Sequence, residues 1–407
     1  MADNPSFPSA APYRLSSQDA TFIYGESQTG PLHIGSIGLF EGQVDFNGLL
    51  GHFEERMHLV PRYRQRLSEV PLNFAHAMME DDPEFAVENH VHLHELPEAI
   101  SEGDALSEMM RVYQTPLDRE RPLWKLHVFH NLHGNRTALM WKVHHCLVDG
   151  VSGVELLKVM YDFRAEPDDV PQPPEPWVPA KPSSMIRRFA DALRNQVQSV
   201  VDSTINTAVE AIEDPASVVE RARQLGEASR VMTELTTRRI VQTPWHSTPV
   251  TQDRIVAWSR QSFGDFRAIR QAFGGSVNDV VLAMLTEGAA RYLSHHGYTV
   301  EGQQLCVGCP VNVRHKDEKS TLGNRVSMMF PTAPASPMDV VERLKLIHEE
   351  TERIKAAGSA QALEAMMQLG TAMPPSMIAP AARVATTMLD VGGRLSKWTD
   401  WKPRANG

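Results

Sequence analysis

Two adjacent histidines followed by an aspartate and a glycine are the residues of this chain best suited to acid–base chemistry: His144, His145, Asp149 and Gly150. A histidine titrates near neutral pH, so it can take a proton from a hydroxyl and return one to a leaving group. Asp149 lies further along a bent loop, and we expect it to hold that loop by pairing with an arginine. Asp-Gly is a strong turn signal. On these residues alone, a histidine pair that merely packs at the end of a strand is an equally good interpretation.

A strand and a helix must position these residues. Thr137 to Val143 is a mostly apolar run and predicts a buried strand. Ser152 and Glu155 are three residues apart ahead of an apolar stretch, which is the signature of a capping box. A helix is therefore expected from near Gly153 to about residue 163. The histidines would lie in a tight strand-to-helix turn, where a base is held in one orientation.

The spacing His144-His145-x-x-x-Asp149-Gly150 resembles the HHxxxDG motif of the CoA-dependent acyltransferase superfamily. Chloramphenicol acetyltransferase, the condensation domains of peptide synthetases and the wax ester synthase/diacylglycerol acyltransferases belong to it. Further segments resemble the last group, and they occur in the order of that family. They are residues 15–20 with 31–35, 60–67 (PRFRQRL-like), 122–124 (PLW), 276–279 (ND), 310–314 (NVR) and 322–324 (GN).

The resemblance implies an α/β fold of two chloramphenicol-acetyltransferase-like subdomains, each a mixed sheet flanked by helices, with the active site in a tunnel between them. It implies transfer of a fatty acyl group from acyl-CoA to diacylglycerol or a long-chain alcohol, giving triacylglycerol or wax ester. His145 would be the general base, acyl-CoA a co-substrate, and no cofactor or metal would be needed. No G-x-S-x-G elbow occurs in the chain, which fits direct transfer without a serine acyl-enzyme.

The same resemblance assigns supporting roles to other residues. Asn278, with Asp279 beside it, is the expected donor to the oxyanion. Asp279 also has a purely structural interpretation, because Ser276 and Asp279 fit the start of a helix. The remaining assignments are Pro122, Leu123 and Trp124 as substrate-binding residues, and Asn312, Arg314, Gly323 and Asn324 as residues that support the site, with Arg314 as the partner of Asp149. Apolar side chains in these segments are expected to line the tunnel: Leu123, Trp124, Val277, Val280, Met328 and Met329.

Two other interpretations remain open. Another superfamily member, such as a condensation-type or small-molecule acyltransferase, would share the histidine motif. Alternatively, the chain is an inactive lipid-binding or scaffold protein. After about Thr386 we find no Asn-Val-Pro-Gly-Pro segment and no further strands of the kind the family has. An incomplete or altered C-terminus would leave unpaired sheet edges and exposed apolar surface.

Length and charge limit the class of protein. At 407 residues the chain is long enough for two domains, and its net charge of −10 argues against a nucleic-acid partner. We expect no signal peptide in residues 1–14 and no transmembrane helix, because no run of 18 apolar residues occurs. Three cysteines fit a reducing cytoplasm. The expected location is cytoplasmic, with peripheral contact at a membrane or lipid droplet as the functional alternative. The oligomeric state is open.

Seven prolines between residues 167 and 182 mark the clearest boundary, because such a segment is extended and cannot join a central sheet. We expect an N-terminal acyltransferase subdomain at 1–163, a proline-rich and helical linker at 164–245, and a C-terminal acyltransferase subdomain at 246–407. Ile186, Phe189 and Leu193 recur at helical spacing in the linker. That helix either packs on the body, which we favour, or lies on a lipid surface.

Three groups of residues invite a ligand interpretation. Cys306 and Cys309 form a C-x-x-C pair, but no second pair completes a zinc site, so core cysteines are favoured. Histidines alternate at positions 90, 92 and 94, and a polar strand face is favoured over a metal site. Arginines alternate at 62, 64 and 66 along an expected extended segment, either as a solvated face or as contacts to a CoA phosphate.

Periodicity predicts the remaining elements. The expected strands cover residues 32–40, 85–93, 124–129, 254–262 and 305–313, and the expected helices 49–60, 105–114, 266–273, 279–295 and 338–356. The third strand and the strand before the histidines should pair as a hairpin.

Overall fold

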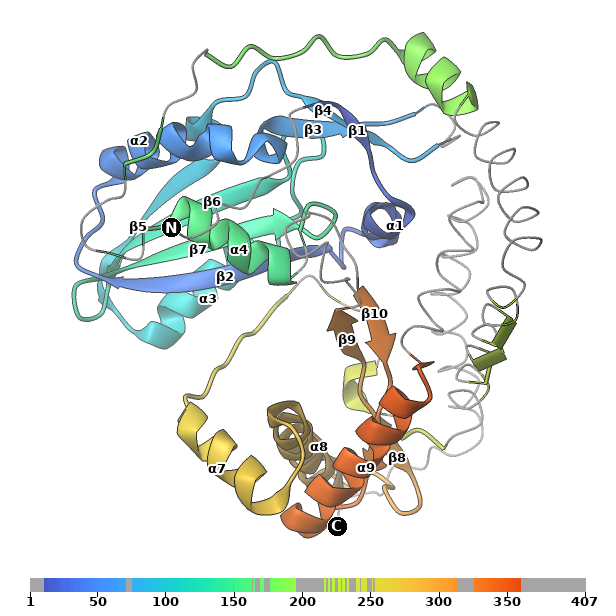
Figure 1. The fold of residues 1–407 in the computed structure, drawn as a ribbon. Helices are drawn as coiled ribbons and strands as arrows, with labels where there is room; N and C mark the ends of the chain where they lie inside the picture. The colour runs from blue at the N-terminus through green and yellow to red at the C-terminus, as the bar shows by residue number, and fades with distance from the viewer. Residues whose placement is uncertain are drawn as a thin grey trace.

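The computed structural model describes most of the chain. The described residues are 11–70, 75–148, 150–162, 164, 169–171, 176–194, 216, 219, 222–223, 226–227, 229–230, 233, 239–241, 243–246, 251, 253–312 and 326–359. The expected departure from the family after residue 386 lies outside them. The fold is mixed α/β, with sheets flanked by helices (Figure 1). The predicted domain boundaries stay a prediction.

A four-stranded sheet is the centre of the N-terminal half (Figure 1). Its strands, in spatial order, are β2 (His33–Glu41), β7 (Arg136–His144), β6 (Trp124–Leu132) and β5 (Val91–Ile100). β2, β7 and β6 pair antiparallel, and β5 joins β6 in parallel. The predicted hairpin is confirmed. The strand predicted at 85–93 is wrong in its position, because residues 87–89 form a 3₁₀ turn before β5 begins.

Helices cover both faces of this sheet: α2 (Phe46–Arg56), α3 (Glu102–Tyr113) and α4 (Gly150–Met160). On β7, Trp141 and Val143 belong to one hydrophobic core, packed with side chains of α2 and α4. Ala138 and Met140 belong to a second core, packed with side chains of α3. Alternation along the strand therefore builds two apolar layers. The helix after the histidines begins at Gly150, ahead of the expected start.

A smaller three-stranded sheet packs beside the first. It consists of β1 (Tyr13–Arg14), β4 (Met78–Asp81) and β3 (Gln65–Ser68), with α1 (Ser17–Gly25) following β1. The expected extended row of arginines is wrong, because Pro61–Arg64 is a 3₁₀ turn. The Arg62 guanidinium lies 4.4 Å from the centroid of the Tyr13 ring, and the Arg64 guanidinium 4.5 Å from that of Trp177. These two side chains do not form a solvated face.

Among its described residues from 253 onward, the C-terminal half has three helices and four short strands. They are α7 (Phe263–Phe273), α8 (Val277–His295), β8 (Gln304–Cys306), β9 (Cys309–Asn312), β10 (Val326–Met329), β11 (Thr332–Pro334) and α9 (Val340–Ala356). β9 pairs with β10, and β8 with β11. The strand predicted at 305–313 is interrupted at Val307 and Gly308, and the one predicted at 254–262 is wrong, since residues 253–262 form no strand. Among the described helices, none is long and apolar enough to span a membrane.

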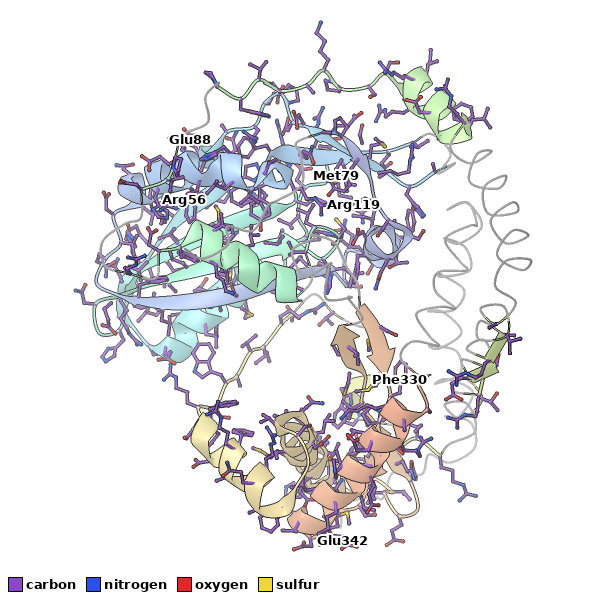
Figure 2. The ribbon with its side chains drawn as sticks, viewed as in Figure 1. Arg56, Met79, Glu88, Arg119, Phe330 and Glu342 are labelled. Carbon is purple, nitrogen blue, oxygen red and sulfur yellow. The ribbon has the colours of Figure 1, made fainter. Side chains whose placement is uncertain are left out.

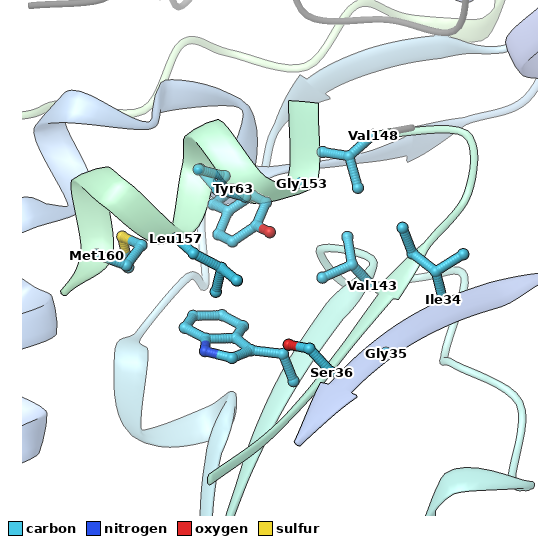
Figure 3. Close-up of a pocket in the computed structure, with 11 residues that line it drawn as sticks. Ile34, Gly35, Ser36, Tyr63, Val143, Val148, Gly153, Leu157 and Met160 are labelled. Carbon is cyan, nitrogen blue, oxygen red and sulfur yellow. The ribbon is translucent and has the colours of Figure 1, made fainter. Parts of the chain in front are cut away.

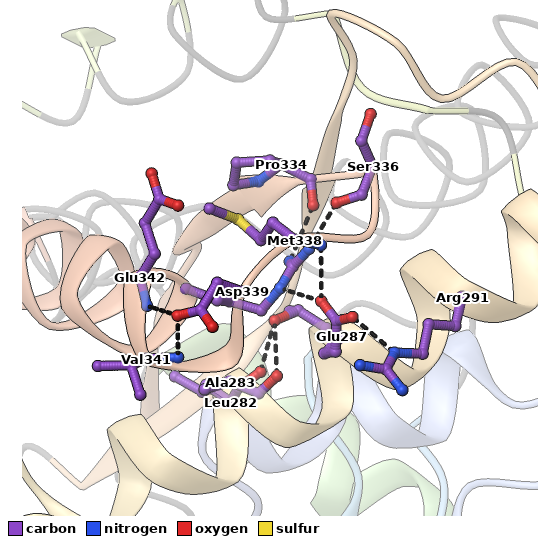
Figure 4. Close-up of polar contacts among 12 residues, drawn as sticks. Leu282, Ala283, Glu287, Arg291, Pro334, Ser336, Met338, Asp339, Val341 and Glu342 are labelled. Carbon is purple, nitrogen blue, oxygen red and sulfur yellow. Dashed lines mark hydrogen bonds and ion pairs between the residues drawn. The ribbon is translucent and has the colours of Figure 1, made fainter.

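A buried ion pair joins α8 to α9 and to the loop after β11 (Figure 4). The Arg343 side chain is fully buried, and its Nε donates to Glu287 Oε2 at 2.7 Å. Its two remaining nitrogens donate to the carbonyls of Pro334 and Ser336 at 2.9 and 2.7 Å. Arg291, which is mostly exposed, donates to the other carboxylate oxygen at 2.6 Å. Each nitrogen of the buried guanidinium group thus donates to an acceptor.

This arrangement predicts unequal effects for two arginines that share one carboxylate. Arg343→Met should lower the free energy of unfolding by about 3–5 kcal/mol, because it removes the buried cation that donates to the Glu287 carboxylate and to two carbonyls. Arg291→Met is the matched control and should cost about 1 kcal/mol or less, because its guanidinium is solvated. Urea denaturation followed by circular dichroism measures both. Equal losses would contradict the structural role given to Arg343.

Candidate active site

The histidine pair lies in a strand-to-helix turn, as predicted: β7 ends at His144 and α4 begins at Gly150. Two backbone hydrogen bonds fix this turn. The His145 N–H donates to the Leu32 carbonyl at 2.9 Å, and the Leu147 N–H donates to the His144 carbonyl at 3.0 Å. The turn is therefore tied to the segment that leads into β2.

Asp149 lies outside the described residues, and so do Arg314, Gly323 and Asn324. β9 ends at Asn312, but nothing describes its side chain. The pairing of Asp149 with Arg314 therefore stays a prediction.

His144 is fully buried and holds the turn from inside. Its Nδ1 accepts a hydrogen bond from the Cys146 N–H at 3.2 Å. An accepting Nδ1 leaves the ring proton on Nε2 in the neutral imidazole. This Nε2 lies 3.4 Å from Glu26 Oε1, within ion-pair distance but not aligned as a hydrogen bond. The His144 ring is therefore enclosed by the protein and has a structural role in the turn.

Glu26 is the site residue that sequence reasoning missed. Its buried carboxylate accepts the Leu32 N–H at 3.0 Å on Oε1, and the Arg119 Nε and Nη2 at 3.2 and 2.9 Å on Oε2. Arg119 also donates to the Ile23 carbonyl at 2.8 Å, so it ties the end of α1 to the segment before β6 (Figure 2). Burial alone would raise the pKa of Glu26, but the contacts with His144, Arg119 and the Leu32 N–H together lower this pKa to about 2. A carboxylate therefore stands beside the turn at neutral pH.

His145 is the accessible member of the pair. Its ring is half-buried and lies on the Phe22 ring of α1, with the centroids 4.0 Å apart and the planes 5° apart. Stacking fixes the plane of the imidazole while leaving part of it open to a substrate. Because His144 is enclosed, His145 is the better placed of the two to exchange a proton with a ligand.

The Pro122-Leu123-Trp124 segment braces the turn from the neighbouring strand. The Leu123 carbonyl accepts the His144 N–H at 2.9 Å. The Trp124 ring is fully buried, stacks on Tyr63 and His90, and donates from Nε1 to the Tyr63 carbonyl at 2.7 Å. The contacts described are structural, and a direct part in substrate binding stays a prediction.

Asn278 and Asp279 open α8, and the structure gives them different environments. Asp279 completes the predicted capping box with Ser276 and also accepts a hydrogen bond from the Thr351 hydroxyl at 2.8 Å. Burial would raise the pKa of Asp279, but these hydrogen bonds and that from His348 lower it. Asn278 is exposed, and among the described residues no hydrogen bond connects it to the histidine turn. The expected oxyanion role of Asn278 is therefore not tested.

An apolar pocket of about 290 Å³ lies between the sheet and α4, directly beside the turn (Figure 3). Its walls are side chains and backbone from β2, β7, the turn and α4, with one ring from the 3₁₀ turn before β3. The lining residues are Ile34, Gly35, Ser36, Tyr63, Trp141, Val143, Val148, Gly153, Leu156, Leu157 and Met160. Leu123 and Trp124, expected in the tunnel wall, are not among them. Mostly apolar lining with few polar groups is typical of a site for a small or chain-like organic ligand.

The residues considered for metal binding have other partners. His92 and His94 flank His127 on one face of the sheet, with His94 Nε2 3.0 Å from His127 Nδ1. Burial, and then the neighbouring histidines and lysines, lower the pKa of His127 to about 3. His90 instead stacks on Trp124. Cys306 and Cys309 lie in two different strands and form no disulfide. In the part of the chain that the structure describes, no three potential ligands gather at one point.

Comparison with known proteins identifies the family. A model of the wax ester synthase/diacylglycerol acyltransferase catalytic domain matches residues 15–281. A putative and a probable diacylglycerol O-acyltransferase of Mycobacterium tuberculosis are 28% and 26% identical, over 84% and 90% of this chain and 72% and 76% of their own.

Solved structures share the fold. A wax ester synthase/diacylglycerol acyltransferase from Marinobacter aquaeolei VT8 is 21% identical with a TM-score of 0.55, covering 90% of this chain and 79% of its own. A variant starter condensation domain of rhizomide synthetase, in complex with C8-CoA, is 14% identical with a TM-score of 0.51, covering 90% and 76%. The family model spans more than half of the 407 residues and includes the whole histidine turn. The chain therefore belongs to the wax ester synthase/diacylglycerol acyltransferase catalytic domain family.

Proposed function

We propose that this protein is an acyltransferase that moves a fatty acyl group from acyl-CoA to diacylglycerol or a long-chain alcohol. The observation that carries the proposal is an accessible, ring-stacked His145 in a rigid turn beside an apolar pocket. Family membership, the names of the mycobacterial relatives and the C8-CoA complex of a protein with a similar fold support these substrates.

In the proposed reaction, His145 accepts the proton of the acceptor hydroxyl as the oxygen attacks the thioester carbonyl. The tetrahedral intermediate collapses by breaking the C–S bond, and the imidazolium returns its proton to the departing CoA thiolate. The ester and free CoA are the products. His144, enclosed against Glu26, does not exchange protons with substrate but keeps the turn in place. We retain Asn278, at the N-terminus of α8, as the proposed oxyanion donor, since a helix N-terminus favours negative charge.

Contact with a lipid surface is a second part of the proposal. The helix at residues 185–194 exposes Met185 at 62% and Ile186 at 83%, next to the exposed Arg187, while Arg188 donates to Ser68 and to the Glu69 carbonyl and ties the helix to the body. Exposed apolar groups beside cationic ones are typical of helices that lie on a membrane or lipid droplet. Such contact would deliver water-insoluble acceptors without a spanning helix.

The base assignment has a direct test. His145→Ala should lower kcat by roughly 10²–10⁴-fold with little change in KM, because general base catalysis usually contributes that much. Release of CoA thiol from palmitoyl-CoA with dioleoylglycerol or hexadecanol measures it. Near-normal turnover in a folded variant would eliminate the assignment. No turnover by the wild-type protein with any acceptor would instead indicate a lipid-binding homologue without activity.

The acceptor length gives a second test. Each buried methylene contributes about 0.8 kcal/mol, so kcat/KM should rise steeply from butanol to long alcohols and level off once the apolar site is filled. Equal values for butanol and hexadecanol, with acyl-CoA saturating, would favour a small-molecule acyltransferase.

Glu26 predicts a dependence of stability on pH. Its folded pKa of about 2 lies below the ordinary value of 4.5, so its contribution is complete above pH 4.5 and is lost as the pH falls toward 2. Wild-type protein should be more stable than Glu26→Gln by up to about 3 kcal/mol at pH 6, and the difference should vanish near pH 2. Glu84→Gln, at a carboxylate that is 70% exposed, is the control and should show no such trend. Chemical denaturation across this pH range is the measurement.

A further inference from the structure

The apolar pocket beside the histidine turn contains one phenol that has no partner in the protein. Tyr63 is 1% exposed, and its hydroxyl oxygen is buried without a hydrogen-bond partner among the described residues. Figure 3 shows the hydroxyl directed into the pocket, toward Val148 and Gly153. Buried polar groups are nearly always hydrogen-bonded, so an unpaired one aimed into a cavity points to a ligand that supplies the acceptor.

The protein holds the Tyr63 ring in place without using its hydroxyl. The ring stacks on Trp124 with the centroids 5.0 Å apart, and the Tyr63 carbonyl accepts the Trp124 Nε1–H at 2.7 Å. Burial raises the pKa of Tyr63 above its ordinary value, so the phenol keeps its proton and acts as a donor at neutral pH. The hydroxyl is thus fixed in orientation and available to one acceptor oxygen.

The pocket also borders the catalytic turn. Val143 and Val148, which line it, are two residues before and three residues after His145 in the chain. On the β2 side of the pocket, the lining residues Gly35 and Ser36 are exposed. A chain held there passes the turn along mostly apolar walls, with the hydroxyls of Tyr63 and Ser36 as the polar groups and that of Tyr63 the buried one.

We infer that this pocket binds an acyl chain of a glyceride acceptor and that the Tyr63 hydroxyl donates a hydrogen bond to its ester carbonyl. The inference rests on the proposed function and deepens it, since it assigns the protein a preference for diacylglycerol over a plain fatty alcohol. With the acceptor hydroxyl at His145, a diacylglycerol has an ester carbonyl a few bonds away, whereas a fatty alcohol has only methylenes. The acyl chain of the donor does not meet the requirement either, because its only carbonyl is the thioester carbonyl at the reacting position.

Two acceptors that differ only in the carbonyl provide the test: 1,2-dioctanoylglycerol and its diether analogue 1,2-dioctylglycerol. The wild-type protein should prefer the diester in kcat/KM, and Tyr63→Phe should reduce the diester-to-diether ratio by about two- to tenfold, the usual effect of one neutral hydrogen bond. Activity with hexadecanol should stay unchanged. An unaltered diester-to-diether ratio in Tyr63→Phe, or an equal loss on all three acceptors, would overturn the inference.

Tyr13→Phe is the matched control. The Tyr13 hydroxyl is also buried without a hydrogen-bond partner among the described residues, but Tyr13 does not line the pocket, so its removal should leave the ratio unchanged. Without ligand, Tyr63→Phe should be as stable as the wild type or more stable, since it removes an unpaired polar group from the interior. A marked loss of stability would mean that the hydroxyl has a structural partner, and would also overturn the inference.

Binding separates this inference from the proposed function. Trp141 lines the pocket, so titration of intrinsic tryptophan fluorescence with the two glycerolipids reports occupancy without turnover. If the wild type binds the diester more tightly and Tyr63→Phe does not, the pocket assignment holds even where no acyl transfer is measured. Equal binding of the diester and the diether by the wild type would overturn it even where transfer is observed.

Discussion

A buried carboxylate at the end of α1 is the constraint on which the candidate site depends. Glu26 contacts or bonds three parts of the chain that lie far apart in sequence: Leu32 before β2, Arg119 before β6, and His144 at the end of β7. A buried charge is costly unless it is paired and hydrogen-bonded, and here each carboxylate oxygen has a donor. The contacts of the Glu26 carboxylate thus hold together the segments that lead into β2 and β6 and the histidine turn at the end of β7.

The contact with Glu26 gives the two histidines different roles. The ring whose nitrogen accepts a backbone N–H and faces Glu26 has little freedom to act as a base, whereas the next ring, stacked on Phe22, stays open. Adjacent residues at the end of a strand point to opposite sides, and here one ring is enclosed against Glu26 while the other lies on Phe22. The direction of each side chain and the contacts it makes therefore give His144 and His145 different chemistry.

Local signals predicted much of the fold, because they depend on short-range physics. The hairpin, the capping box at Ser276 and Asp279, and the helix after the histidines follow from periodicity and caps. The parallel partner β5, the 3₁₀ turn at Pro61–Arg64 and the Glu26–Arg119 pair do not, since each is decided by contacts between distant segments. Glu26 lies between the matched segments 15–20 and 31–35, and Arg119 lies three residues before the PLW segment. This nearness to the motifs was the only sign in the sequence that the two residues could belong to the site. Motif resemblance located the histidine turn, but the lining of the apolar pocket required the tertiary structure.

The strand order of the main sheet has a consequence for synthesis of the chain. β6 and β7 pair across a short turn, but the partner of β2 among the described residues is β7, about a hundred residues later. On the ribosome, β2 emerges long before its partner exists, with its backbone donors and acceptors unpaired in the sheet. Such non-local pairing is slow and leaves a strand open to association with other chains. The strand β2 can therefore pair in the sheet only once β7 has been synthesised. The histidine turn follows β7 directly, so it forms at the same stage of synthesis.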